Sequence, residues 1–312
     1  MPSRVIITAP CHPWLIEKLS KSYAVDFRPD ITYIQLLELI GDAEGLVVTT
    51  RIKVDAALLA RAKGLRWIGR LGSGLELIDT EAAAAKGIQV FSSPEGNRNA
   101  VAEQALGMLL GVLHNIPKSM REIGEGKWIR AANRGTELHG KTVGIIGFGN
   151  TGSQFAKLLQ PFGVTVLAYD NGKSGFASGY IREAQPEQIQ RYADIISFHV
   201  PLNEESRHMC NLNFMAACRQ KPVILNTSRG KVVKEADLVT ALQQGHISAA
   251  CLDVLENEKL DTYTPEELSR LQWLLAQPNV IITPHIAGYT HEAYLGMAEV
   301  LYRKLSTTGA TL

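Results

Sequence analysis

Short apolar runs alternate with amphipathic, helix-like segments along nearly the whole chain, and this alternation restricts the possible folds more than any other feature. A first series of strand candidates lies at residues 4–10, 23–27, 45–50, 65–72 and 88–93. A second series begins after Lys141 and comprises TVGIIG, VTVLAYD, DIISFHV, PVILNTS, SAACLDV and NVIITPH. Runs this apolar suit strands buried on both faces, as in parallel sheets covered by helices. The pattern predicts an α/β fold with two parallel sheets, of which the second is doubly wound.

The two series predict two domains. At 312 residues the chain is longer than one ordinary core requires. A helical stretch over about 99–124 follows the first series, and the tail from 289 to 312 is helical but too short to fold alone. We expect the tail to return to the first domain. The first domain then comprises residues 1–98 and 289–312, and the second comprises residues 99–288.

Composition indicates a well-packed protein with neither nucleic acid nor membrane as partner. Hydrophobic residues make up 46% of the chain, and the formal net charge of +1 gives no attraction to nucleic acid or an acidic membrane surface. The four cysteines are scattered, which predicts reduced core thiols rather than disulfides or a metal site. The N-terminus lacks a signal-peptide pattern and no apolar run could span a membrane, so we expect a cytoplasmic protein.

Three glycines, Gly147, Gly149 and Gly152, have the G-x-G-x-x-G spacing between a predicted strand and a predicted helix. In that setting the first glycine permits a tight turn, the second admits a pyrophosphate and the third allows close helix–strand packing. The next strand ends in Asp170, whose carboxylate can accept both hydroxyls of an adenosine ribose and would repel a 2′-phosphate. The motif therefore predicts NAD as the cofactor. An ordinary turn followed by a solvated aspartate is the alternative.

Three further polar residues, Arg229, Glu258 and His285, follow strands of the same predicted sheet. The carboxyl ends of parallel strands line the ligand crevice of such folds. A histidine can exchange a proton with an alcohol or carbonyl, a neighbouring carboxylate can orient it, and an arginine can bind a substrate carboxylate. Each residue also has a structural alternative: an ion pair for Arg229, solvation in an acidic loop for Glu258, and a core position for His285.

Several segments, in order, resemble the D-isomer-specific 2-hydroxyacid dehydrogenases. They are GRLGSGLELIDTEAAAAKGI, NAVAEQALGMLL, ELHGKTVGIIGFGNTG, HVPLNEESRHM, ILNTSRGKVV, ACLDVLENEKL and TPHIAGYT. The resemblance implies a Rossmann NAD domain inserted into a smaller flavodoxin-like substrate domain, and a homodimer built largely on the NAD domains. It also implies that His285 transfers the proton, that Glu258 holds it and that Arg229 binds the substrate carboxylate.

The resemblance assigns further residues to the cofactor and the substrate. The cofactor set adds Asn150, Thr151, His199, Pro201, Thr227, Ser228, Asp253 and Gly288 to the three glycines, Asp170, Arg229 and His285. The substrate set comprises Arg51, Arg70, Ser73, Gly74, Asn97 and Arg229, and no metal ligands are expected.

Within the family, the segments GRLGSGLELID and PEGNRNAVAEQALGMLL most resemble the phosphoglycerate dehydrogenase branch, which makes 3-phosphoglycerate the favoured substrate. Arg51 and Arg70 would then supply charge for the phosphate, unless they serve as surface or interdomain pairs. The chain departs from that branch at two positions: Thr49 stands where many of those enzymes carry an arginine, and Glu76 stands where an aspartate is common. These departures, together with an extended loop over 259–279, leave glyoxylate, hydroxypyruvate or another 2-keto acid as alternatives. An NAD-sensing scaffold without turnover is a second alternative.

Overall fold

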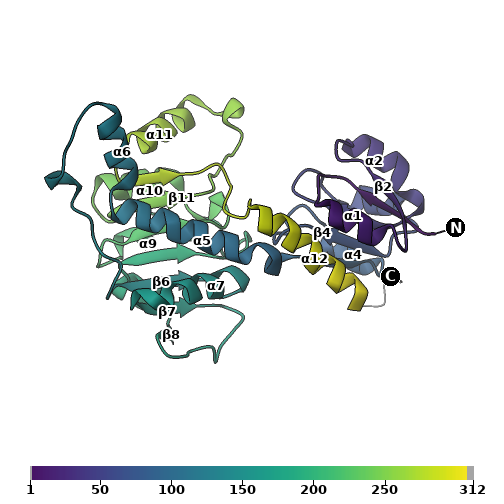
Figure 1. Cartoon of the computed structure of the whole chain (residues 1–312), viewed down its shortest axis with the longest axis horizontal. Coiled ribbons are helices and arrows are strands. Elements are labelled where there is room, and N and C mark those ends of the chain that lie inside the picture. The colour runs from purple at the N-terminus through teal and green to yellow at the C-terminus, as the bar shows by residue number, and fades with distance from the viewer. Residues whose placement is uncertain (1, 308–312) are drawn as a thin grey trace. The chain divides into compact units, whose positions relative to one another are not determined.

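The computed structural model describes residues 2–307, which fold into two compact units. Residues 2–98 and 289–307 form unit 1, and residues 99–288 form unit 2. Each unit contains one parallel sheet with helices packed against it (Figure 1). The expected fold class, two parallel-sheet α/β domains, is confirmed.

The sheet of unit 1 has five parallel strands in the order β2-β1-β3-β4-β5, which is the flavodoxin-like order. All five strand candidates of the first series form strands: β1 (Arg4–Ile7), β2 (Ala24–Phe27), β3 (Ala43–Val48), β4 (Trp67–Arg70) and β5 (Gln89–Ser92). The helices of this unit are α1 (Pro13–Leu19), α2 (Tyr33–Leu39), α3 (Ala56–Arg61), α4 (Thr80–Ala85) and α12 (His291–Thr307). Short polar side chains begin several of them, as where Asp55 accepts a hydrogen bond from the Leu58 backbone N–H.

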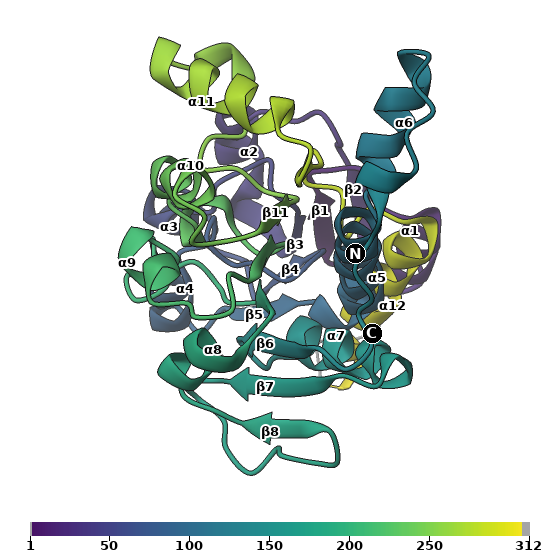
Figure 2. The same cartoon turned by 90° about the vertical axis from the view of Figure 1, so that its left-hand side faces the viewer.

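The sheet of unit 2 has seven parallel strands in the order β12-β11-β10-β9-β6-β7-β8. The six strand candidates of the second series form β6 (Thr142–Ile146), β7 (Thr165–Tyr169), β9 (Ile195–Phe198), β10 (Val223–Asn226), β11 (Ala249–Leu252) and β12 (Val280–Ile282). The seventh strand, β8 (Ile181–Glu183), extends the edge beside β7 (Figure 2). The strand order reverses at β6, between β7 and β9, and this is where such sheets bind ligands.

The helices of unit 2 differ from expectation at one place. The stretch over 99–124 is divided into α5 (Pro94–Leu113) and α6 (Ile116–Gly124), because Asn115 has a left-handed backbone (φ 54°) and Pro117 follows it. The other helices are α7 (Asn150–Leu159), α8 (Pro186–Tyr192), α9 (Leu212–Ala216), α10 (Glu235–Gln243) and α11 (Pro265–Ala276). No helix within residues 2–307 is long and apolar enough to cross a membrane.

Candidate active site

The glycine turn between β6 and α7 leaves open space above the start of α7. Gly147 has φ +94°, and a Cβ added there would lie 2.4 Å from the His199 carbonyl oxygen. A Cβ on Gly152 would lie 2.0 Å from the Gly147 carbonyl oxygen, so this glycine allows the helix to pack closely. A Cβ on Gly149 would meet nothing within 4 Å. The turn is therefore tight on its inner side and open where an anion would approach.

The first turn of α7, with Asn150 and Thr151, presents backbone N–H groups to this opening. Gly149 is the N-cap residue, and no side chain of residues 2–307 caps the helix. After β10, at the carboxyl edge of the same sheet, the Thr227 hydroxyl oxygen is buried and has no hydrogen-bond partner within residues 2–307. Helix N–H groups and a hydroxyl without a partner are donors that suit the phosphates and polar groups of a dinucleotide. The residues present thus fit NAD.

Asp170 follows β7 and connects this strand to the glycine turn. Its Oδ2 accepts a hydrogen bond from the Phe148 backbone N–H at 2.8 Å, and its Oδ1 accepts one from the Gly172 N–H at 3.0 Å. A carboxylate offers about four lone-pair directions, so each oxygen still has capacity for a hydroxyl. Asp170 therefore holds the backbone of the glycine turn at Phe148 and also lies beside the open space above the turn.

His199 and Pro201 follow β9, next to the glycine turn. The His199 Nε2 lies 2.8 Å from the Ser197 hydroxyl, while its Nδ1 is buried and has no partner within residues 2–307. Burial lowers the pKa of His199 from 6.5 to about 4. At neutral pH this imidazole is therefore uncharged.

Arg229 follows β10 in a turn that Asn226 organises. The Asn226 side chain is fully buried, accepts a hydrogen bond from the Ser228 N–H at 3.0 Å and donates one to the Arg229 carbonyl at 2.8 Å. The guanidinium Nη1 of Arg229 donates to the Ser228 carbonyl at 2.7 Å. The turn therefore carries Arg229 out of the core at the carboxyl edge of the sheet.

His285 and Glu258, from separate loops, are in contact. The His285 Nδ1 lies 2.9 Å from the Glu258 Oε2, and both side chains are a little under half exposed. Because an ionised carboxylate can only accept, this contact places a proton on Nδ1. The His285 Nε2 is thereby available to take or give a proton. The structure thus brings together two of the three expected catalytic residues, and Arg229 follows a strand of the same edge.

The loop that carries His285 is held by Asp253, at the end of β11. Asp253 is 1% exposed, and its carboxylate accepts hydrogen bonds from the Ile286 N–H at 3.0 Å, the Ala287 N–H at 2.8 Å and the Thr283 hydroxyl. His285 itself has a left-handed backbone with φ 57°. Such a conformation is costly for a non-glycine residue and persists where the surroundings enforce it. Gly288 ends the same loop and is the last residue of unit 2.

The expected substrate residues, Arg229 apart, lie in unit 1, at the carboxyl edge of its sheet or at the start of α5. The Arg51 Nη2 donates to the Ile31 carbonyl at 2.9 Å. Arg70, at the end of β4, is 9% exposed and donates to the Leu71 carbonyl. Ser73 and Gly74 follow β4, and Asn97 lies in the first part of α5. Both arginines thus make backbone contacts within unit 1.

Two residues that hold the site, Asn226 and Thr283, are not among those predicted from the sequence. Asn226 and Thr283 contact backbone or carboxylate groups next to Arg229 and His285. One signal was present: a buried asparagine ending an apolar strand must satisfy its amide locally. Thr283 carries no comparable signal.

The model of the D-isomer specific 2-hydroxyacid dehydrogenase NAD-binding domain matches residues 106–287 of the chain. The chain is 35% identical over 293 residues to a D-3-phosphoglycerate dehydrogenase of Methanocaldococcus jannaschii, covering 93% of this chain and 54% of that protein. It is 36% identical over 271 residues to a hydroxypyruvate reductase of Thermotoga maritima, covering 87% of this chain and 86% of that protein. The chain thus spans about half the length of the phosphoglycerate dehydrogenase.

Among solved structures, a D-lactate dehydrogenase of Aquifex aeolicus, complexed with NAD and lactic acid, superposes with a TM-score of 0.84. It is 26% identical, and the alignment covers 98% of this chain and 96% of that one.

The buried, uncharged His199 predicts a loss of stability in acid. Because its pKa is about 4 in the folded chain and about 6.5 when unfolded, the unfolded state binds the proton first as the pH falls through this window. The cost should be about 3 kcal/mol by pH 4. In urea unfolding from pH 7.5 to 4, a His199→Gln variant should lose less stability than the wild type. Parallel curves for the two proteins would contradict the assignment.

Proposed function

We propose that this chain, which belongs to the D-isomer specific 2-hydroxyacid dehydrogenase family, interconverts a small D-2-hydroxy acid and its 2-keto acid with NAD. The observation that carries the proposal is the contact between His285 and Glu258 at the carboxyl edge of a sheet whose glycine turn fits a dinucleotide. When bound, NAD supplies the acceptor or donor of the hydride. The chain must then bind the acid and move one proton.

His285 moves that proton in the proposed reaction. Its Nδ1 is occupied by Glu258, so its Nε2 accepts the hydroxyl proton in oxidation and returns it to the carbonyl oxygen in reduction. Glu258 keeps the ring oriented and favours the imidazolium that forms when the proton arrives. Arg229 binds the substrate carboxylate, since a guanidinium offers paired donors in the geometry of a carboxylate.

The remaining predicted residues have supporting roles in the same proposal. The turn from Gly147 to Gly152 and the first turn of α7 bind the pyrophosphate, and Asp170 binds the adenosine ribose. Thr227, Ser228 and Asp253 lie after neighbouring strands, as the nicotinamide side of the site requires. The backbone at Ser73 and Gly74 binds the substrate from unit 1.

We favour 3-phosphoglycerate as the first substrate to test, because the resemblance to phosphoglycerate dehydrogenases extends over most of the chain. Hydroxypyruvate is the second candidate. It is favoured by the name of the Thermotoga maritima relative and by the contact of Arg51 with the Ile31 carbonyl, which engages one of the donors expected to meet a phosphate.

An NADH-oxidation assay with a panel of 2-keto acids tests the reaction, and His285→Ala tests the mechanism. We expect turnover with at least one acid, a loss of about a hundredfold or more in the variant, and little change in NADH affinity. His246→Ala is the matched control, because this half-buried histidine lies just before β11, at the opposite end of that strand from Asp253, and its Nε2 lies 3.0 Å from the Gln244 Oε1. NADH binding without turnover of any acid would favour a scaffold that senses NAD.

Asp170→Ala should weaken NADH binding about tenfold and narrow the preference for NADH over NADPH, since the ribose hydroxyls lose a charged acceptor. Asp194→Ala is the control, because the Asp194 carboxylate also accepts a backbone N–H, that of Thr142, but at the start of β6 rather than at its carboxyl end. Fluorescence titration with both cofactors measures the effect. Unaltered affinity and selectivity in Asp170→Ala would remove this residue from the cofactor site.

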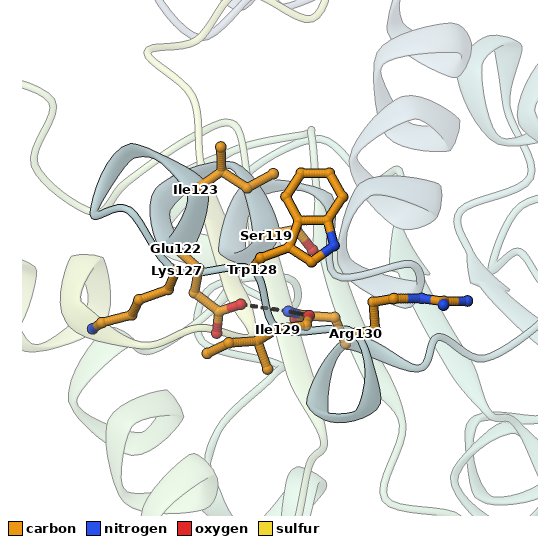
Figure 3. Close-up of a pocket in the computed structure, with 8 residues that line it drawn as sticks. Ser119, Glu122, Ile123, Lys127, Trp128, Ile129 and Arg130 are labelled. Carbon is orange, nitrogen blue, oxygen red and sulfur yellow. Dashed lines mark hydrogen bonds between the residues drawn. The ribbon is translucent and has the colours of Figure 1, made fainter.

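We further propose that the chain forms a homodimer through α6 and the segment after it. Ile116, Met120 and Ile123 recur at helical spacing on α6 and are 50%, 69% and 55% exposed, and Trp128 is 81% exposed. Ile123 and Trp128 also line a cavity of about 290 Å³ with Ile129 and Lys127 (Figure 3). An apolar helix face left in water is typical of a surface that a partner covers.

Met120→Glu should therefore convert a dimer into a monomer, because the charge would have to be buried at the interface. The control is Ile34→Glu in unit 1, since Ile34 on α2 is 70% exposed and so matches Met120. Sedimentation velocity reads the mass of each protein. Monomeric wild-type protein at micromolar concentration, or a Met120→Glu variant that stays dimeric, would refute this interface.

A further inference from the structure

The segment that follows Arg229 and the segment that precedes Glu258 are in direct backbone contact. A Cβ added to Gly230 would lie 1.8 Å from the Leu255 carbonyl oxygen, so only glycine permits this approach. Gly230 follows Arg229 directly, and Leu255 lies three positions before Glu258. The spacing between two proposed catalytic residues is thus determined at this contact.

Glu235 and Glu256 join the same two segments through a reciprocal pair of hydrogen bonds. The Glu256 Oε2 accepts from the Glu235 backbone N–H at 2.9 Å, and the Glu235 Oε1 accepts from the Glu256 backbone N–H at 2.5 Å. Glu235 is the first residue of α10, where helix N–H groups favour negative charge. Burial, together with the nearby Glu256, raises the pKa of Glu235.

His208 holds the second oxygen of Glu256. Its Nε2 lies 2.6 Å from the Glu256 Oε1, and its backbone N–H donates to the Lys231 carbonyl at 2.7 Å. His208 has a left-handed backbone with φ 52°. Both carboxylate oxygens of Glu256 are therefore engaged by groups from outside its own loop, and one of these groups is held in a strained conformation.

The Glu258 side chain, whose Oε2 contacts the His285 ring, is 45% exposed and so is not oriented by burial. The two residues that precede it are held in place. Glu256 is bound as described, and the Asn257 carbonyl accepts from the Tyr263 hydroxyl at 2.6 Å. The direction of the Glu258 carboxylate thus depends on the anchoring of the residues before it.

We infer that Glu256 is a positioning residue, which fixes the loop bearing Glu258 through its contacts with His208 and Glu235 and so orients the His285 imidazole. The inference rests on the proposed function for its catalytic consequence. The alternative is that the Glu256 contacts only stabilise the fold. The positioning role and the purely structural role differ in whether the effect of Glu256 on turnover depends on Glu258.

A double-mutant cycle of Glu256→Ala and Glu258→Gln separates the two cases. If Glu256 acts through Glu258, Glu256→Ala should lower kcat between about tenfold and a hundredfold with little change in the KM for NADH. The double variant should be no slower than Glu258→Gln alone. Glu256→Gln, which keeps an acceptor for the Glu235 N–H, should recover most of the activity.

Asp237→Ala is the matched control, because the Asp237 carboxylate on α10, like that of Glu256, contacts a side-chain nitrogen, here that of Lys234, and accepts a backbone N–H, here that of Leu212. These contacts do not involve the Glu258 loop, so kcat should be unchanged. Wild-type kcat in Glu256→Ala, or losses that multiply in the double variant, would overturn the inference.

The nitrogen-15 chemical shifts of the His285 imidazole provide a readout that needs no turnover. The Glu258 contact favours the proton on Nδ1, so Glu256→Ala should lower the population of that tautomer in the same direction as Glu258→Gln. A tautomer population equal to that of the wild type would refute the positioning role. If the wild type turns over no 2-keto acid while the tautomer shifts as expected, the proposed function fails and the positioning role stands.

Discussion

The buried carboxylate of Asp253 is the contact on which the geometry of the candidate active site depends. The carboxylate accepts hydrogen bonds from two backbone N–H groups and one hydroxyl of the loop after β12. The backbone carbonyl of Asp253 accepts a further hydrogen bond from the His285 N–H at 2.7 Å. Because Asp253 is 1% exposed, water cannot take the place of its carboxylate in these hydrogen bonds. The strained conformation of His285 is maintained because these bonds fix the residues on both sides of it.

The loop bearing Glu258 is fixed by a different means. There the carboxylate of each of Glu235 and Glu256 accepts a hydrogen bond from the backbone N–H of the other. The His208 imidazole contacts the remaining carboxylate oxygen of Glu256. Two carboxylates this close would repel each other, and the N-terminus of α10 and the imidazole offset that repulsion. His285 and Glu258 are therefore in contact because the two loops that carry them, each held by its own hydrogen bonds, bring them together. Neither side chain is buried enough to be oriented by packing alone.

Most of the fold could be predicted from the sequence because buried parallel strands are continuous apolar runs. The exception, β8, has the sequence IRE and lies at the edge of the sheet, where one apolar residue in three gives no strand signal. The break between α5 and α6 was predictable in principle from Pro117, but the apolar periodicity on both sides obscured it. Local backbone geometry at Asn115 decided the outcome, and periodicity does not report it.

The residues of the candidate site likewise fall into those that could be predicted from the sequence and those that could not. His285, Glu258 and Arg229 could be proposed because strand ends converge in a parallel sheet and because the segments resemble a family. Glu256 and His208 could not, since their roles depend on which backbone N–H or carboxylate each one reaches, and spacing along the chain does not determine those distances. A hydrogen bond from a side chain to the backbone needs only a charged or amide group at the right position in space, so it leaves no recognisable pattern of residues along the chain. A search for residue types therefore finds the groups proposed to carry out the reaction and overlooks those that hold them in position.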